Sequence, residues 1–400
     1  MENNSKNAFF PGLLVLPFCQ DPVQTSCSVA MWLWTLLPPV FLVLGTCGNF
    51  LNLVILSRKR LRAHSTTIFL LFLAVSDITI LWCSFLRQWF LRVVDLDILN
   101  VSVFTCTVHI WMTYTSGAFS AWLLVLVTIE RTFVIAWPVY SRGKVTRKNA
   151  LISCISLLVI IMVFMGFFLF AFDMQTVPSK TLTKNDTTPA LETVACLPRT
   201  KEMHEFIAGT WRIVVFIALN LLPLLIISTG NTIIAINLIL YTKRRRRRIQ
   251  PDIPAPSTLS KRTVSATKIP LFLCSFFLIT TIPYTSFGVI KSKYFKDVTD
   301  VETNAHLQLA HAVTYVLLYG NYTFNFLLYF VTGTLFKTEW NEIVNTMKNR
   351  HSVFVIRNTE GITEVNTEVL TVEKTHRHKI HALSRQIFAR TIFCLLPQYT

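Results

Sequence analysis

Charged residues are scarce in this sequence, since only 15% of its 400 residues are Asp, Glu, Lys or Arg, whereas 52% are hydrophobic. A soluble protein of this length would fold as two or three domains with charged surfaces. The sequence also has no nucleophile elbow, no phosphate-binding loop, and no group of His, Cys and Glu at the spacing of metal ligands. These absences argue against an enzyme and against any metal or organic cofactor bound by such motifs.

Long apolar runs are what the sequence has instead. About 20 consecutive apolar residues cross a bilayer as one helix. Seven such blocks occur, at residues 31–56, 67–91, 103–137, 149–172, 209–241, 266–290 and 305–331. We therefore predict an all-α membrane protein. Its expected parts are an N-terminal tail (1–30), a seven-helix transmembrane domain (31–331), a short amphipathic helix (332–346) and a tail (347–400) that we expect to be disordered.

Basic residues are distributed unevenly among the links between the blocks. The links after the first, third and fifth blocks hold clusters such as SRKRLRAH (57–64) and KRRRRR (243–248), whereas the other links balance their bases with acids. The positive-inside rule then places the N-terminus outside the cell and the C-terminus in the cytoplasm, as in a multi-pass plasma-membrane protein. We interpret the net charge of +17 as topology plus attraction to anionic lipid, not as nucleic-acid binding.

The segments placed outside carry features of extracellular protein. N-glycosylation sequons lie at Asn3, Asn100 and Asn185. Cys106 opens the third block on its outer side and Cys196 lies in the outer link before the fifth, so both face an oxidising compartment and we expect a disulfide between them. Cys19 and Cys27 either pair in a second small loop or stay separate. The apolar stretch 8–19 is broken by two prolines, so we interpret it as a tail rather than a signal peptide.

Polar side chains recur inside the apolar blocks, where lipid penalises them unless they face a cavity or a partner. Two of them, Asn321 and Asn325, lie one helical turn apart and so share a face. Three more polar side chains inside the blocks are those of Asn49, Asp77 and Ser120. An adjacent pair of opposite charges, Glu130 and Arg131, lies near the end of the run LLVLVTIERTFVIAWP (123–138).

Seven features occur in a fixed order along these blocks. They are GN (48–49), LAVSD (73–77), a Cys at 106 that precedes the Arg of ERT (130–132) by 25 residues, Pro138, Pro223, Pro283 and NFLLY (325–329). In this respect residues 31–346 resemble the rhodopsin-like (class A) seven-transmembrane G-protein-coupled receptors. The finer likeness is to invertebrate neuropeptide receptors of the FMRFamide and myosuppressin-like groups. The resemblance implies a receptor that binds an extracellular ligand and activates a heterotrimeric G protein.

The family resemblance also implies a mechanism of activation. Glu130 would hold Arg131 at the cytoplasmic membrane edge until the sixth helix swings outward. The switch residues implied in this way are Glu130, Arg131, Pro223, Phe277, Pro283, Asn325 and Tyr329. The alternative, from the residues alone, is an ion pair at the membrane surface with no switching role.

A sodium pocket is the second implied site. Its oxygen ligands would be Asp77, Ser120, Asn321 and Asn325, with Asn49 nearby, and a bound Na⁺ would act as an allosteric ion that stabilises the inactive packing. The alternative is a hydrogen-bonded polar core that holds only water.

The sequence departs from the family pattern at several positions. Residues 280–283 read Thr-Thr-Ile-Pro where the family has Cys-Trp-x-Pro, and Phe326 replaces the proline of the seventh-helix motif. Asn231 stands in place of a tyrosine and Thr263 in place of an acidic partner for Arg131. A decoy receptor that binds a ligand without signalling is therefore an alternative. A transporter is a weaker one, because the two halves of the sequence show no repeat.

The expected ligand is a short peptide. Thr113 stands where aminergic receptors have Asp, and residues 305–331 contain no Lys for a retinal Schiff base. The outer halves of the helices offer aromatic and basic side chains suited to an amphipathic ligand. The predicted ligand-binding set is Arg87, Gln88, His109, Thr113, Tyr114, Trp211, Arg212, Tyr284, Phe287, His311, Tyr315 and Tyr319. For Arg87 the alternatives are pairing with Asp95 or Asp97, or extension toward the membrane surface.

The cytoplasmic side is expected to hold the remaining partners. KRRRRR (243–248) suits anionic membrane lipid or the G protein. Hydroxyl residues of the tail are candidate phosphorylation sites that would recruit arrestin, and the alternative is a tail without that role.

Overall fold

The computed structural model describes residues 25–62, 64–178, 192–247, 261–294, 300–332 and 336–347. Within these ranges the side chains of residues 177–178, 192–193, 208, 212, 241–242, 244–247, 261–269, 292–293 and 332 are not described. The chain divides into two compact units, Met1–Trp340 and Asn341–Thr400. In the second unit the described part is the helical stretch 341–347.

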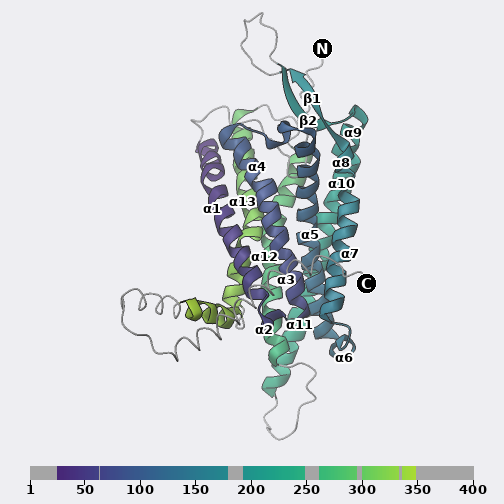
Figure 1. Cartoon of the computed structure of the whole chain (residues 1–400), viewed down its shortest axis with the longest axis vertical. Helices are drawn as coiled ribbons and strands as arrows, with labels where there is room; N and C mark the ends of the chain where they lie inside the picture. Colours follow the sequence, from purple (N-terminus) through teal and green to yellow (C-terminus); the bar gives the residue numbers. More distant parts are fainter. Residues whose placement is uncertain are drawn as a thin grey trace, which may run out of the picture. The chain divides into compact units, whose positions relative to one another are not determined.

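The first unit is built from long helical segments that run side by side (Figure 1). The first is α1 (Thr25–Leu56). The second combines α3 (Ser65–Ile80), η1 (Leu81–Phe85), α4 (Leu86–Trp89) and η2 (Phe90–Val94), and the third is α5 (Val103–Ala136). The fourth combines α7 (Arg147–Met165) and α8 (Phe168–Ala171). The fifth combines α9 (Lys201–Phe206), η4 (Ile207–Trp211), α10 (Arg212–Val215), η5 (Phe216–Leu221) and α11 (Leu222–Arg247); α12 (Lys261–Tyr294) and α13 (Val301–Thr332) follow.

Shorter elements lie in the links. They are α2 (Lys59–Arg62), the 3₁₀ turn η3 (Ile98–Val101), α6 (Pro138–Ser141) and the strands β1 (Phe172–Pro178) and β2 (Glu192–Pro198).

The predicted seven-helix bundle is confirmed by these segments. Among the described residues, six of the segments are long and apolar enough to cross a membrane, and α13 is a more polar seventh. The predicted ranges for the first and fifth segments begin too late. Residues 25–30 belong to α1 rather than to the tail, because Cys27 and Ala30 pack into the bundle. The fifth segment begins at Lys201, where the Thr200 side chain accepts a hydrogen bond from the Met203 N–H and caps the helix.

The short helix after the bundle was predicted at 332–346, but residue 332 still belongs to α13 and the described helical stretch is 336–347. The rest of the predicted tail lies outside the described residues.

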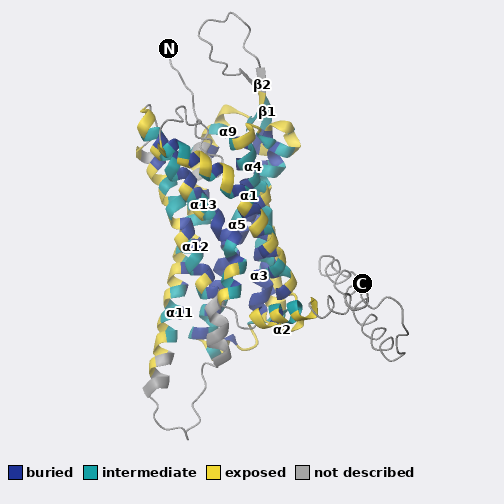
Figure 2. Ribbon diagram, turned by 90° about the vertical axis from the view of Figure 1, so that its left-hand side faces the viewer, coloured by how far each residue is buried: buried dark blue, intermediate teal, exposed yellow. Residues whose placement is uncertain are grey.

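The pattern of burial is that of a membrane protein, because apolar side chains lie on the outside of the bundle as well as in its core. Buried residues gather along α3 and α5, whereas exposed residues mark α11 (Figure 2). Large apolar side chains face outward, for example Val163 at 74% exposed and Ile279 at 68%. Because lipid tails are as apolar as these side chains, such exposure is stable in a bilayer.

A β-hairpin covers the N-terminal end of α5. Strands β1 and β2 pair antiparallel, with Met174 opposite Cys196. The predicted disulfide is confirmed, since Cys106 and Cys196 are bonded with their Cα atoms 5.7 Å apart. The hairpin itself was not predicted from the sequence. Cys27 is also disulfide-bonded, whereas Cys19 lies outside the described residues.

Candidate functional site

Glu130 and Arg131 form an ion pair at the end of α5 that lies beside the basic links. The Arg131 Nη2 donates to the Glu130 carboxylate and to the hydroxyl of Thr66, and that hydroxyl in turn donates to the same carboxylate. Arg131 is 8% exposed, so its charge depends on these partners. Three polar groups on α3 and α5 thus form one closed network.

A second contact links α5 to α12 one turn away. The Thr128 hydroxyl lies 3.2 Å from the Cys274 thiol, and both side chains are buried. The predicted switch residues Phe277 and Tyr329 are buried as well, at 3% and 1% exposed. Pro223 lies near the start of α11, and Pro283 lies within α12.

A polar cluster around Asp77 occupies the middle of the bundle. Asp77 on α3 is fully buried, and its carboxylate accepts hydrogen bonds from Ser120 on α5, at 2.9 Å, and from Asn325 on α13. Asn49 on α1 donates to the carbonyls of Gly45 and Tyr322, at 2.9 and 2.8 Å. The cluster therefore connects four helices through hydrogen bonds.

Asn321 lies one turn before Asn325 and has an unusual environment. It is 1% exposed, and neither its amide oxygen nor its nitrogen has a hydrogen-bond partner among the described residues. The Asn325 Oδ1 is likewise buried without a partner there. Buried amides normally have hydrogen-bond partners. These oxygens could therefore coordinate a Na⁺ ion or accept hydrogen bonds from a water molecule. A site of three or more His, Cys, Asp or Glu side chains was not found in the described ranges.

Arg87 is held by Asp97 near the end of the bundle that carries the β-hairpin, which is the end predicted to lie outside. Its Nε and Nη2 donate to the two carboxylate oxygens at 2.7 and 2.6 Å. The left-handed backbone of Asp95, with φ at 56°, ends the second helical segment and turns the chain back, which brings Asp97 to Arg87. Burial raises the pKa of the Asp97 carboxyl, whereas the hydrogen bonds and the charge of Arg87 lower it by a larger amount. The pKa of Asp97 therefore lies below its usual value. The structure thus has the pairing that was the alternative for Arg87.

Tyrosines from α13 pack with residues of α1 and η1. The rings of Tyr315 and Tyr319 stack with centroids 4.6 Å apart, and the Tyr319 ring stacks on Phe85 at 4.5 Å. The Tyr315 hydroxyl donates to that of Tyr319 at 3.1 Å, and both contact the hydroxyl of Ser84. These predicted ligand-binding tyrosines are thus packed in a buried cluster.

His311 and its neighbours form the outer edge of this cluster. The His311 ring lies 5.8 Å from Trp34 and 5.9 Å from Phe287, and Tyr284 packs edge-on against Tyr315 at 5.9 Å. The Nε2 of His311 is buried and has no hydrogen-bond partner in the described part of the chain.

A second aromatic group lies between α5, α8 and η4. Tyr114 stacks on Phe168 at 4.6 Å, and Trp211 packs edge-on against Phe168 at 5.7 Å. The Trp211 Nε1 and the Thr113 hydroxyl are buried, and the described residues offer them no hydrogen-bond partner.

Arg87 connects the two aromatic groups electrostatically, since its charge acts on His109, Tyr114 and Tyr315. Gln88, beside it, is 1% exposed. The predicted ligand-binding residues whose side chains are described therefore lie around one region, called here the outer region after the predicted orientation. The side chain of Arg212 is outside the described residues, as are the sequons at Asn3 and Asn185.

Several polar partners in these sites were missed by sequence reasoning. Thr66 completes the ion-pair network, and Ser84 bonds to two tyrosines. Both are single hydroxyl residues within apolar segments, and their placement beside a polar group depends on how the helices are rotated. The only available signal was their position within an apolar block.

Comparisons with known proteins agree with this architecture. The profile of the family described as "7 transmembrane receptor (rhodopsin family)" matches residues 48–329. The chain is 34% identical over 137 residues to the cholecystokinin receptor type A of Rattus norvegicus, which covers 34% of this chain and 30% of that protein. It is 34% identical over 112 residues to the galanin receptor type 2 of Rattus norvegicus, which covers 28% of this chain and 29% of that protein. Each match thus spans under a third of the relative.

Proposed function

This chain belongs to the rhodopsin family of seven-transmembrane receptors, and we propose that it binds an extracellular peptide and activates a heterotrimeric G protein by helix rearrangement. The two relatives are named for the peptides cholecystokinin and galanin. The predicted kinship to invertebrate neuropeptide receptors is the finer form of this proposal. In it the N-terminus is extracellular, the C-terminus is cytoplasmic, and arrestin and membrane lipid are further partners.

Unpaired polar atoms in the outer region support a peptide ligand. The Trp211 Nε1, the Thr113 hydroxyl and the His311 Nε2 are buried without partners in the described residues. Leaving such an atom unsatisfied costs about 1–3 kcal/mol, and a ligand that supplies the missing partner recovers that free energy. A peptide backbone offers both carbonyl acceptors and N–H donors, so it can satisfy all three atoms.

Positive charge in the outer region favours a ligand with an anionic group. The Arg92 guanidinium lies over the Trp34 ring, 5.5 Å from its centroid, and its charge acts on Lys291 and His311. Arg87 is already paired with Asp97, so in this proposal it positions the neighbouring groups rather than meeting the ligand. A peptide carboxylate, or an acidic side chain, would then lie near Arg92 and Lys291.

The network at Thr66, Glu130 and Arg131 suits the resting state of the switch. Arg131 is turned toward α3 by its two partners, and α12 is tied to α5 through Thr128 and Cys274. Outward movement of α12 would break the second contact and open the surface beside Arg131 for the G protein. The ligand drives this change only if it binds the open packing more tightly.

The Asp77 cluster fits an allosteric Na⁺. Asp77, Ser120, Asn321 and Asn325 are the residues that would hold it. A bound cation supplies a positive charge to the buried carboxylate and thereby favours the packing in which these helices lie together.

A G-protein dissociation assay in cells tests the function. Cells that express the chain are screened against a library of neuropeptides, with an Arg131→Ala variant at matched surface expression as the control. We expect at least one peptide to cause dissociation with the unaltered chain and not with the variant. A peptide that binds the surface of these cells without dissociation of any G-protein subtype would instead identify a decoy receptor.

A further inference from the structure

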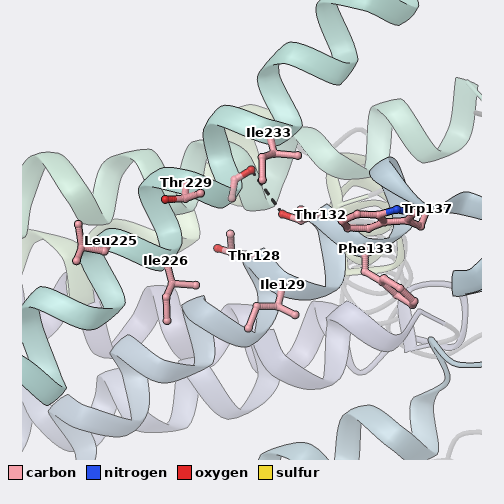
Figure 3. A pocket seen from close by; sticks show the side chains of 10 residues that line it. Thr128, Ile129, Thr132, Phe133, Trp137, Leu225, Ile226, Thr229 and Ile233 are labelled. Carbon is pink, nitrogen blue, oxygen red and sulfur yellow. Dashed lines mark hydrogen bonds between the residues drawn. The ribbon is translucent and has the colours of Figure 1, made fainter.

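A groove between α5 and α11 has no charged side chain among the residues that line it (Figure 3). Its walls are apolar side chains such as Ile129 and Ile233, together with threonines and Gly230. A carboxylate placed there would lose its hydration without gaining a cation. An anionic ligand group therefore does not fit this groove, and Arg92 in the outer region is a better partner for it.

Two consecutive prolines shape the N-terminal half of α1. Because proline has no N–H, Pro38 and Pro39 leave two carbonyls in the preceding turn without their usual helical partner. One of them, the Thr35 carbonyl, accepts a hydrogen bond from the Trp89 Nε1 at 3.2 Å. The prolines thus allow a polar contact between α1 and the second helical segment that a regular helix would not offer.

Trp34, in the same turn of α1, is buried against the outer region. It is 5% exposed, and its ring centroid lies 5.0 Å from that of Tyr315 and 5.8 Å from that of His311. The Arg92 guanidinium lies over the same ring, 5.5 Å from the centroid. Arg92 follows Trp89 by three residues, so both side chains lie on the face of the second segment that meets α1. Trp34 was not among the predicted ligand-binding residues.

Arg87 and Arg92 are held in different ways. Arg87 is neutralised by Asp97, to which it donates two hydrogen bonds. The Trp34 ring holds Arg92 through a cation–π contact, which fixes the position of the charge but adds no negative charge to offset it. The charge of Arg92 also acts on Lys291 of α12, so two cations contribute to the potential here. Together they attract an anionic group to the space between η2 and α12.

We propose that Trp34 is a positioning residue of the ligand site, which holds the Arg92 guanidinium where it receives a carboxylate of the peptide ligand. A guanidinium in a fixed orientation can donate two parallel hydrogen bonds to a carboxylate, so its placement matters as well as its charge. The carboxylate belongs to the C-terminus of the peptide or to an acidic side chain, which offer the same charge and acceptor atoms. The inference rests on the proposed function for its ligand, but carboxylate binding is measured without any signalling.

Photolabelling of the full chain in lipid nanodiscs with three small probes tests the inference. Each probe is an acetylated dipeptide that begins with photoleucine, whose diazirine forms a covalent bond on irradiation. The second residue is phenylalanine with a free carboxylate, phenylalanine amide or aspartic acid amide, so two probes are anionic and one is neutral.

The quantity measured is the anion preference, which is the labelling by the better anionic probe divided by the labelling by the neutral probe. Mass spectrometry maps the label, and we expect it in residues 30–38 and 86–94. Because hydrogen bonds to a charged group are at stake, the anion preference of the unaltered chain should be about tenfold or more. The better of the two anionic probes shows whether the carboxylate is that of a C-terminus or of a side chain.

Substitutions at Trp34 separate positioning from packing. Trp34→Leu removes the ring and should lower the anion preference by about 2- to 30-fold, the range expected for a cation–π contact. Trp34→Phe keeps an aromatic face and should retain more of the anion preference than Trp34→Leu does. A role of Trp34 in packing alone would lower the labelling by all three probes alike and leave the anion preference unchanged.

Two further variants are controls. Arg92→Gln removes the cation itself and should lower the anion preference at least as much as Trp34→Leu does. Trp32→Leu, at a position on the same helix that is 63% exposed, should leave it unchanged. An anion preference near one in the unaltered chain, or a Trp34→Leu variant that keeps the full preference, would overturn the inference. A preference that depends on Trp34 and Arg92 supports it even if no peptide causes G-protein dissociation, a result that would contradict the proposed function alone.

Discussion

The backbone N–H of Cys196 donates to the side-chain oxygen of Asn100, 2.9 Å away, on the strand that the disulfide joins to α5. This hydrogen bond ties the β-hairpin to the turn between the second and third helical segments. Asn100 also begins a sequon whose third residue, Ser102, caps α5 through the Thr105 N–H. Both polar side chains of the sequon therefore have structural partners, independently of any glycan on the Asn100 nitrogen.

We predict that Asn100→Ala destabilises the hairpin, whereas Asn100→Asp does not. Both substitutions prevent glycosylation, but only aspartate keeps an oxygen that accepts from Cys196. The expected difference between the two variants is about 1 kcal/mol, the net value of one hydrogen bond. Thermal unfolding of the purified chain in detergent measures it, and equal midpoints for the two variants would contradict the structural role.

Glu130→Gln should raise basal signalling, because neutralising the carboxylate weakens the partner that holds Arg131. Hydrogen bonds to charged groups contribute about 1.5–3 kcal/mol, which corresponds to a shift of about 10- to 100-fold in the switch equilibrium. Thr66→Val, which removes the shared hydroxyl at nearly constant volume, should act in the same direction with a smaller effect. Basal nucleotide exchange at matched surface expression is the measurement. No change in either variant would show that this network is structural only.

The Arg87–Asp97 pair should make stability depend on pH on the acid side. The folded pKa of Asp97 lies below its unfolded value of about 4, so the ion pair stabilises the fold fully above that unfolded value. This contribution is lost as the pH falls toward the folded pKa. Asp97→Asn should cost about 3–5 kcal/mol at neutral pH, because Arg87 is left buried and unpaired.

Thermal unfolding of the unaltered chain and of Asp97→Asn between neutral and acid pH checks the sign. The two midpoints should approach each other as the pH drops below about 4. The double variant Arg87→Gln/Asp97→Asn is the control, and it should be more stable than Asp97→Asn alone. A constant difference across the pH range would be inconsistent with this role of Asp97.

Na⁺ should stabilise the unaltered chain more than K⁺ does, and Asp77→Asn should remove the difference. A ligand present at about 100 times its Kd stabilises a fold by about 2.7 kcal/mol, which sets the largest shift expected. Thermal unfolding in matched chloride salts measures the effect. If both cations act alike on the unaltered chain, the unpaired amide of Asn321 is satisfied by water instead.

Gly230→Ala should loosen the packing of α5 against α11, because the new methyl group collides with the Thr128 side chain. Overpacking of this kind costs about 1–3 kcal/mol. Thr128→Ser removes the methyl group at the collision, so the double variant should recover most of the lost stability. Failure of Thr128→Ser to rescue would place the strain elsewhere.

Much of the architecture was predictable because it depends on local composition. Each apolar block of sufficient length must become a helix in a bilayer, since no other single segment satisfies its backbone there. The disulfide followed from two cysteines that the basic links predict to lie on the oxidising side. The pairing of Glu130 with Arg131 needed only that two opposite charges be adjacent in an apolar run.

Contacts between helices were less predictable. For Arg87 the sequence left three alternatives open, and the backbone turn at Asp95 selected Asp97. Tyr315 and Tyr319 are predicted ligand-binding residues, and their contacts with Phe85 and Ser84 depend on the rotation of α13, which the sequence does not reveal. The sequence alone determined which segments cross the membrane and which side chains are too polar to face lipid. The tertiary structure decided which of those side chains meet, and where a recess remains, because apolar helix surfaces are so alike that small differences in packing set their rotation and tilt.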